Sequence, residues 1–217
     1  MACDDVRVTS RIRAALLDAL AVLSPVDCAG CGAPDRSLCD HCRQALTAAV
    51  TPRSLADGST VFTALRYEGV VRRTLLALKE SGRTDVVGAL SVPFAQALSR
   101  AAQPGAEFLA VPTSTVAWRR RGYDPVALLA KRAGIRPAKV LRSARTTASQ
   151  KTLGAGDRAR NLEASMVAKT SLSGRRFVLI DDVVTTGATL AEAARAITSA
   201  GGEVVGRAAL AFTPRLY

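Results

Sequence analysis

From residue 61 onward, hydrophobic and polar positions predict short buried strands separated by amphipathic helices. A continuous apolar run, typical of a strand covered on both faces, occupies 177–180. Strands are also expected at 61–67, 107–111 and 203–211. Helical periodicity or helix-forming composition occupies 70–79, 86–102, 124–134 and 188–200. Strands that alternate with helices predict βαβ units, and therefore an α/β fold with a mostly parallel sheet.

Two helix boundaries are marked by their residue types. Asp124 precedes Pro125, which predicts an N-cap followed by a proline at the first helical position. Gly201 and Gly202 follow the helix expected at 188–200, which predicts its C-terminal cap.

The region before residue 61 has a different character. Ile12, Leu16, Leu20 and Leu23 lie along one face of an expected amphipathic helix, and the polar stretch "TPRSLADGS" at 51–59 is typical of a linker. We therefore expect a small domain at 1–55 and a larger one at 56–217. No segment is long enough to span a bilayer, and no signal for export is evident, so a cytoplasmic location is expected.

Four of the five cysteines form two pairs with the spacing C-x2-C-x7-C-x2-C. Cys28, Cys31, Cys39 and Cys42 can place four thiolates at the corners of a tetrahedron, and Gly30 and Gly32 allow a tight turn around the first pair. This pattern predicts a structural zinc site. Disulfides are disfavoured without an export signal, and a thioredoxin-type motif would leave the second pair unexplained. His41, the only histidine, is an alternative ligand but is expected to be exposed.

An acidic pair follows the apolar run at 177–180. Asp181 and Asp182 could accept hydrogen bonds from sugar hydroxyls, whereas Thr185, Thr186, Gly187, Ala188 and Thr189 lead into a helix whose free N–H groups suit a phosphate. The stretch is neither a Walker A loop nor a GxGxxG turn. The alternative is that the aspartates merely end a strand and cap a turn.

Positive charge is concentrated in one segment of a chain whose net charge is +12. Residues 119–160 contain twelve Lys or Arg and only two Asp, a distribution that attracts polyphosphate or nucleic acid, or that simply keeps a surface soluble. Within it, the polar stretch 143–162 is either a functional lid or a loose insertion. Trp118, beside three arginines, could stack on a base, but a packing role at the sheet edge is favoured.

Several of these stretches together resemble a known family. "VLIDDVVTTGATL" resembles the phosphoribosyl-pyrophosphate (PRPP) loop of type I phosphoribosyltransferases. The wider set resembles the ComF family, associated with DNA uptake in competence: "LLDALAVLSPVDCAGCG", "YEGVVRRTLLALK", "VPTSTVAWRRRGYD" and "TTASQKTLGAGDRARNL". The resemblance implies a type I phosphoribosyltransferase-like, Rossmann-type parallel sheet with a small N-terminal zinc-binding subdomain.

The resemblance also implies roles for individual residues. Asp181 and Asp182 would hold the ribose hydroxyls, and Thr185 to Thr189 the 5′-phosphate. The turn Val111, Pro112 and Thr113, with Arg121 nearby, would face a pyrophosphate that arrives with Mg²⁺. Gln150, Arg158 and Asn161 match the lid pattern, and Lys79 could reach the ligand. Tyr123, Asp124 and Pro125 replace the "FNQ" common in the family.

Two functions remain open at the level of the sequence. The first is a PRPP-binding phosphoribosyltransferase that transfers a phosphoribosyl group with release of pyrophosphate. The second is a non-catalytic adaptor for DNA uptake that binds single-stranded DNA, beside a competence helicase. Both ligands are polyanions, so charge alone does not separate these hypotheses.

Overall fold

A computed structural model describes residues 26–144 and 165–214 of the chain. By their internal contacts, the residues divide into two compact units, neither of which is continuous in sequence. The cysteine unit comprises Met1–Leu46 and Glu68–Val86, and the sheet unit comprises Thr47–Tyr67 and Val87–Tyr217. The helix expected around 12–23 lies outside the described residues.

The sheet unit contains a five-stranded sheet of order β1-β2-β7-β6-β3 and a two-stranded sheet of β4 and β5. In the larger sheet β2, β7, β6 and β3 are parallel, and β1 is an antiparallel edge strand, so the predicted mostly parallel sheet is confirmed. The elements are β1 Thr51–Ser54, β2 Thr60–Arg66, α4 Val87–Ala101, β3 Glu107–Ala110, α5 Thr115–Arg121, α6 Pro125–Arg132, β4 Leu141–Ser143, β5 Met166–Ala168, β6 Arg176–Val184, α8 Ala188–Ser199 and β7 Glu203–Phe212.

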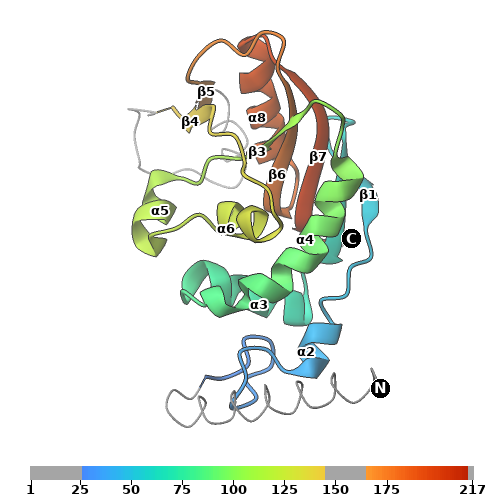
Figure 1. Ribbon diagram of the computed structural model, residues 1–217, viewed down its shortest axis with the longest axis vertical. Coiled ribbons are helices and arrows are strands. Elements are labelled where there is room, and N and C mark those ends of the chain that lie inside the picture. The colour runs from blue at the N-terminus through green and yellow to red at the C-terminus, as the bar shows by residue number, and fades with distance from the viewer. Residues whose placement is uncertain (1–25, 145–164, 215–217) are drawn as a thin grey trace, which may run out of the picture. The chain divides into compact units, whose positions relative to one another are not determined.

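Helices cover both faces of this sheet (Figure 1). On one face Phe177 and Leu179 of β6 pack in a core cluster with residues of α8 such as Leu190 and Ile197. On the other face α4 approaches so closely that a Cβ on Gly206 would lie 2.6 Å from the Ala101 carbonyl oxygen. Because both faces of β6 are covered, its residues 177–180 are all apolar and fully buried, as the sequence pattern predicts.

Residues 51–59 form the first strand and the turn of a β-hairpin with β2, not the linker expected from their composition. β1 pairs with β2 from Thr51 opposite Thr63 to Ser54 opposite Thr60. Pro52 is compatible with this position because an edge strand needs hydrogen bonds on one side only. In the turn, Asp57 Oδ1 accepts hydrogen bonds from the Ser59 N–H (3.0 Å) and hydroxyl (2.6 Å).

Both predicted helix caps are present. Asp124 Oδ1 accepts a hydrogen bond from the Ala127 N–H (3.1 Å), with Pro125 as the first residue of α6. At the end of α8 Gly201 has φ 85°, and the Gly202 N–H donates to the Ile197 carbonyl at 3.0 Å.

The cysteine unit is built from short helices around the two CxxC turns. Its described elements are α2 Asp40–Gln44, α3 Gly69–Glu80 and the 3-10 turn η1 Thr84–Val86. The apolar residues of α3 recur at helical spacing, and Val71, Leu75 and Leu78 are buried. This core is small, which makes a metal cross-link physically useful.

Candidate functional site

The acidic pair lies where β6 continues beyond the end of β3. The last paired residues are Ala110 of β3 and Ile180 of β6, and the Val111 N–H still donates to the Ile180 carbonyl at 3.2 Å. β6 itself runs on to Val184 with β7 as its neighbour, so the strand ends four residues after its apolar run of 177–180. The turn after β3 and the two aspartates therefore share one edge of the sheet.

The two aspartates have different environments. Adjacent residues of a strand point to opposite faces of the sheet, which separates the two carboxylates. Asp182 is buried, with 7% of its surface exposed, and its N–H donates to Asp181 Oδ1 at 2.8 Å. Asp181 is partly exposed.

The loop after β6 leads directly into the first turn of α8. Thr185 and Thr186 are exposed, and the Ala188 N–H donates to the Thr186 hydroxyl at 3.3 Å. Gly187 is buried, precedes the first residue of α8 and has φ 84°, a conformation that glycine adopts at little cost. The N–H groups of a first helical turn lack partners within the helix, so this loop can bind an anion.

Pro112 and Thr113 follow the ladder to β6 and lead into α5. Both are partly exposed, whereas Val111 is buried. Ser114 caps α5 by accepting a hydrogen bond from the Ala117 N–H at 3.2 Å. Arg121 ends this helix, and its Nε atom is buried without a hydrogen-bond partner among the described residues. Burial raises the pKa of Tyr123, and the positive charge of Arg121 partly offsets this rise.

The predicted lid residues Gln150, Arg158 and Asn161 lie outside the described residues. The chain on either side of that segment is well defined, because β4 and β5 pair from Leu141 opposite Ala168 to Ser143 opposite Met166. The Ala144 N–H donates to the Ser165 carbonyl at 2.7 Å. The two ends of the segment are therefore neighbours.

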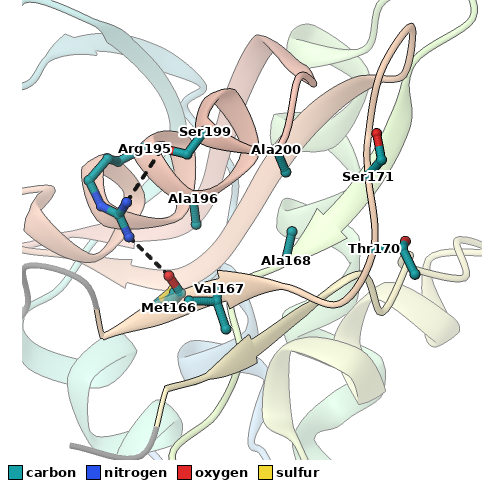
Figure 2. A pocket seen from close by; sticks show the side chains of 9 residues that line it. All are labelled: Met166, Val167, Ala168, Thr170, Ser171, Arg195, Ala196, Ser199 and Ala200. Atoms are coloured by element: carbon teal, nitrogen blue, oxygen red, sulfur yellow. Dashed lines mark hydrogen bonds between the residues drawn. The ribbon is translucent and has the colours of Figure 1, made fainter.

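An ion pair from α8 holds β5 in place. Glu192 is buried, and its Oε1 accepts from the Met166 N–H at 2.9 Å, while Arg195 Nη2 donates to the Met166 carbonyl at 3.0 Å. Arg195 also forms two bonds to the Glu192 carboxylate, at 2.7 and 2.8 Å. Figure 2 shows Arg195 reaching Met166 and Ser199 at one side of a surface pocket between β5 and α8. Small side chains, including Ala168 and Ala196, leave this space open.

The four predicted cysteine ligands come together in the cysteine unit. Their Sγ atoms all lie within 4.8 Å of one another, and the Cys31 and Cys39 sulfurs are 3.7 Å apart. A tetrahedron with Zn–S bonds of about 2.3 Å has edges of about 3.8 Å, so this separation fits zinc. A Cβ on Gly30 would lie 2.6 Å from Cys42 Sγ, which explains the glycine in the first turn. His41 is exposed, as expected.

The surroundings of the sulfurs also suit a metal ion. Burial acts to raise the pKa of the Cys28 thiol, yet N–H groups of Cys39, Cys31 and Gly30 lower that pKa to about 6. Burial and the neighbouring thiols raise the pKa of Cys42 well above its ordinary range. A divalent cation would offset the cost of ionising such crowded thiols. The cluster thus fits a structural zinc site.

Sequence reasoning missed two arginines that hold the cysteine turns. Arg73 of α3 donates through Nε to the Gly30 carbonyl. Arg83 Nη1 donates to the Asp27 carbonyl at 2.9 Å, and its guanidinium is oriented by Asp85 at 2.8 Å. Both arginines lie more than thirty residues after the cysteine knuckle in the sequence, and a surface arginine is usually solvated, so no local pattern indicated these contacts.

Trp118 is not a packing residue at the sheet edge. It lies on α5 with 53% of its surface exposed, and Arg119 and Arg120 beside it are also exposed. α5 is short, its seven residues include three arginines, and its Val116 is also exposed, so this part of the helix faces solvent. Within the described ranges, no helix is long and apolar enough to cross a membrane.

Comparisons with known proteins place the chain in a family. The family described as "Phosphoribosyl transferase domain" matches residues 87–217. Curated relatives include "DNA utilization protein YhgH" of Escherichia coli K12, 27% identical over 186 residues, with 79% of this chain and 82% of the relative covered. The protein of the same name from Escherichia coli O157:H7 is 26% identical over 193 residues, covering 82% and 85%.

Among solved structures, adenine phosphoribosyltransferase from Thermoanaerobacter pseudethanolicus matches with a TM-score of 0.38 and 16% identity, covering 78% of this chain and 96% of that one. The family match spans more than half of the chain and includes the acidic pair, the Thr/Gly loop and the turn after β3. The relatives are consistent with the ComF resemblance, which the cysteine cluster also supports. The chain belongs to the phosphoribosyl transferase domain family.

Proposed function

We propose that the edge formed by β3, β6 and the first turn of α8 binds PRPP. Asp181 and Asp182 accept hydrogen bonds from the ribose hydroxyls, and the loop Thr185–Thr189 binds the 5′-phosphate. The observation that carries the proposal is that these groups are adjacent in the chain and in the fold. The acidic pair lies near the end of β6, and a few residues later the buried Gly187, with φ 84°, leads into α8. A sugar phosphate needs acceptors and amide donors at this short separation.

The pyrophosphate end of the ligand lies, in this proposal, beside Val111, Pro112 and Thr113. The hydrogen bond from Val111 to Ile180 supports this assignment, because Ile180 immediately precedes Asp181. Arg121 supplies positive charge there, and the protein atoms around its Nε leave this donor without a partner among the described residues. Carboxylate oxygens are ligands that Mg²⁺ accepts, so the partly exposed Asp181 fits a Mg²⁺ that would neutralise pyrophosphate charge.

The reaction that fits such a site is transfer of the phosphoribosyl group. The bond from ribose C1 to pyrophosphate breaks, pyrophosphate leaves with the bonding electron pair, and an acceptor forms the new bond to C1. Positive charge develops on the sugar in this step, and the neighbouring carboxylates stabilise it. Arg121 stabilises the departing anion.

Calorimetric titration of PRPP with Mg²⁺ tests the proposal. Asp181→Asn combined with Asp182→Asn should abolish the binding heat while the circular dichroism spectrum stays unchanged. The matched control is Glu107→Gln with Glu203→Gln, which makes the same change in charge at the amino end of the same sheet, where both glutamates are exposed. The control should bind like wild type. Absence of heat with wild-type protein would refute the proposal.

A second candidate function is binding of single-stranded DNA, and the exposure of Trp118 favours it. Exposed indole beside two exposed arginines combines a stacking surface with phosphate-binding charge. The relatives carry the name "DNA utilization protein". Because Trp118 is the only tryptophan in the chain, its fluorescence reports directly on contact with DNA.

Titration with an oligothymidylate distinguishes this function from PRPP binding. DNA contact should quench Trp118 fluorescence, and the logarithm of the affinity should fall steeply with the logarithm of the salt concentration. Trp118→Ala should weaken DNA binding and leave the PRPP heat unchanged. Unaltered fluorescence at saturating oligothymidylate would argue against a DNA contact on α5. A competence helicase, the partner implied by the resemblance, could then be tested by co-purification with and without DNA.

A further inference from the structure

The turn between β1 and β2 reaches the loop that begins α8. A Cβ built on Gly187 would lie 2.8 Å from Leu55 Cδ1 and 3.0 Å from Cδ2, so the Leu55 isopropyl group packs directly on this glycine. Leu55 is partly buried and also packs against the core cluster that contains Leu190. One wall of the loop is therefore provided by a side chain from the opposite end of the sheet unit's sequence.

The backbone around Leu55 is itself well fixed. Its N–H donates to the Ser59 carbonyl at 2.8 Å, and its carbonyl accepts from the Gly58 N–H at 3.1 Å. Asp57 accepts two hydrogen bonds from Ser59, and the charge of Arg207 also acts on this carboxylate. With its backbone held in this way, Leu55 has few ways to move off Gly187.

We propose that Leu55 is a positioning residue for the loop Thr185–Thr189. The inference rests on the proposed function, in which this loop binds the ester phosphate of the ligand. Glycine has the largest freedom of backbone rotation of any residue, and at Gly187 that freedom would let the loop amides point in many directions. Leu55 restricts it, so that the N–H groups at the start of α8 are already arranged for a phosphate before one binds.

Two measurements on Leu55→Ala test this role. Hydrogen exchange of peptides that cover 183–191 should become faster by about tenfold. The dissociation constant for PRPP with Mg²⁺ should rise by about tenfold or more, since small misplacements of binding groups have effects of this order. Leu55→Met, which keeps most of the apolar volume, should restore both values.

Leu98→Ala serves as the control for general loss of stability. Leu98 is 1% exposed on α4, so its truncation should lower the unfolding temperature at least as much as Leu55→Ala. It should nevertheless leave exchange at 183–191 and PRPP affinity within about twofold of wild type. Equal effects of the two variants would show general softening and overturn the role of Leu55.

The two proposals fail in different ways. If wild-type protein binds no PRPP, the proposed function is lost, and exchange at 183–191 still decides whether Leu55 orders the loop. If PRPP binds and Leu55→Ala changes neither exchange nor affinity by more than about twofold, Leu55 has no positioning role.

Discussion

Replacing Arg195 by alanine should destabilise the sheet unit well beyond what an ordinary surface ion pair contributes. Glu192 is buried, with 5% of its side chain exposed, and it would lose the two bonds from Arg195 at 2.7 and 2.8 Å. The Met166 carbonyl would also lose its donor at 3.0 Å. The bond from the Met166 N–H to Glu192 would remain, but the carboxylate would no longer have the charge of Arg195 beside it.

The size of the effect follows from the unequal exposure of the two partners. Breaking a fully buried pair costs about 3–5 kcal/mol, because it leaves an uncompensated charge in the interior. Exposed pairs contribute about 0–1 kcal/mol. The Arg195 side chain is 43% exposed, so water can partly replace it, and we expect a loss of about 2 kcal/mol. For a chain of this length that corresponds to about 4–8 °C in unfolding temperature.

Thermal unfolding followed by circular dichroism measures this effect. Arg176→Ala is the matched control, because the Arg176–Glu203 pair is exposed on both sides, at 44% and 66%. It should lower the unfolding temperature by no more than about 3 °C. The double variant Glu192→Ala with Arg195→Ala should be more stable than the sum of the two single losses implies, since no lone charge remains. If Arg195→Ala shifts the transition no more than the control does, the reasoning from burial is wrong.

Further predictions concern the cysteine turns, the phosphate loop and the hairpin. Metal analysis should find about one zinc per chain, and a fully folded metal-free protein would contradict the zinc site. Gly30→Ala should weaken zinc affinity in a chelator competition by about tenfold or more, because the Cβ of the new alanine would collide with Cys42 Sγ. Gly187→Ala should cost at least about 1–2 kcal/mol in urea unfolding, because φ is 84° and Leu55 occupies the space; an unchanged midpoint would contradict this. The Ser59 hydroxyl lowers the pKa of Asp57 in the folded protein. The stability that the ionised Asp57 contributes to folding is therefore complete above the ordinary pKa of 3.8, and it disappears as pH falls through the lower pKa of the folded state. Because Asp57 is exposed, the free energy of unfolding of wild type should exceed that of Asp57→Asn by less than about 1 kcal/mol at neutral pH, as measured by urea unfolding. This difference should vanish in acid, and a difference that persists there would contradict the role given to the Asp57–Ser59 hydrogen bonds.

The strands and helices that could be predicted are those that show a clear pattern of apolar residues or caps over neighbouring positions in the sequence. The apolar run before Asp181 and the cap at Asp124 each depend on neighbouring residues, and local patterns show such features. β1 was missed because an edge strand needs little apolar surface and tolerates Pro52. β4 and β5 have three residues each, too few for any periodicity to appear.

The candidate site was predictable only where its residues follow one another in the chain. The acidic pair and the Thr/Gly loop form a single stretch, whereas the contact between Leu55 and Gly187 joins residues far apart in sequence. The same holds for α3, which belongs to the cysteine unit although the β1–β2 hairpin lies between them in the sequence, and whose Arg73 donates to the Gly30 carbonyl. Such pairs are decided by tertiary packing, on which periodicity and spacing carry no information.

The order of strands has a consequence for how the protein emerges during synthesis. β7, the last strand of the described chain, occupies the middle of the larger sheet between β2 and β6. All residues of the cysteine unit are therefore synthesised by Val86, whereas β2 cannot pair with β7 until more than a hundred further residues have been made. A nascent chain halted before Glu203 would expose an unpaired edge on both β2 and β6, and such edges favour aggregation.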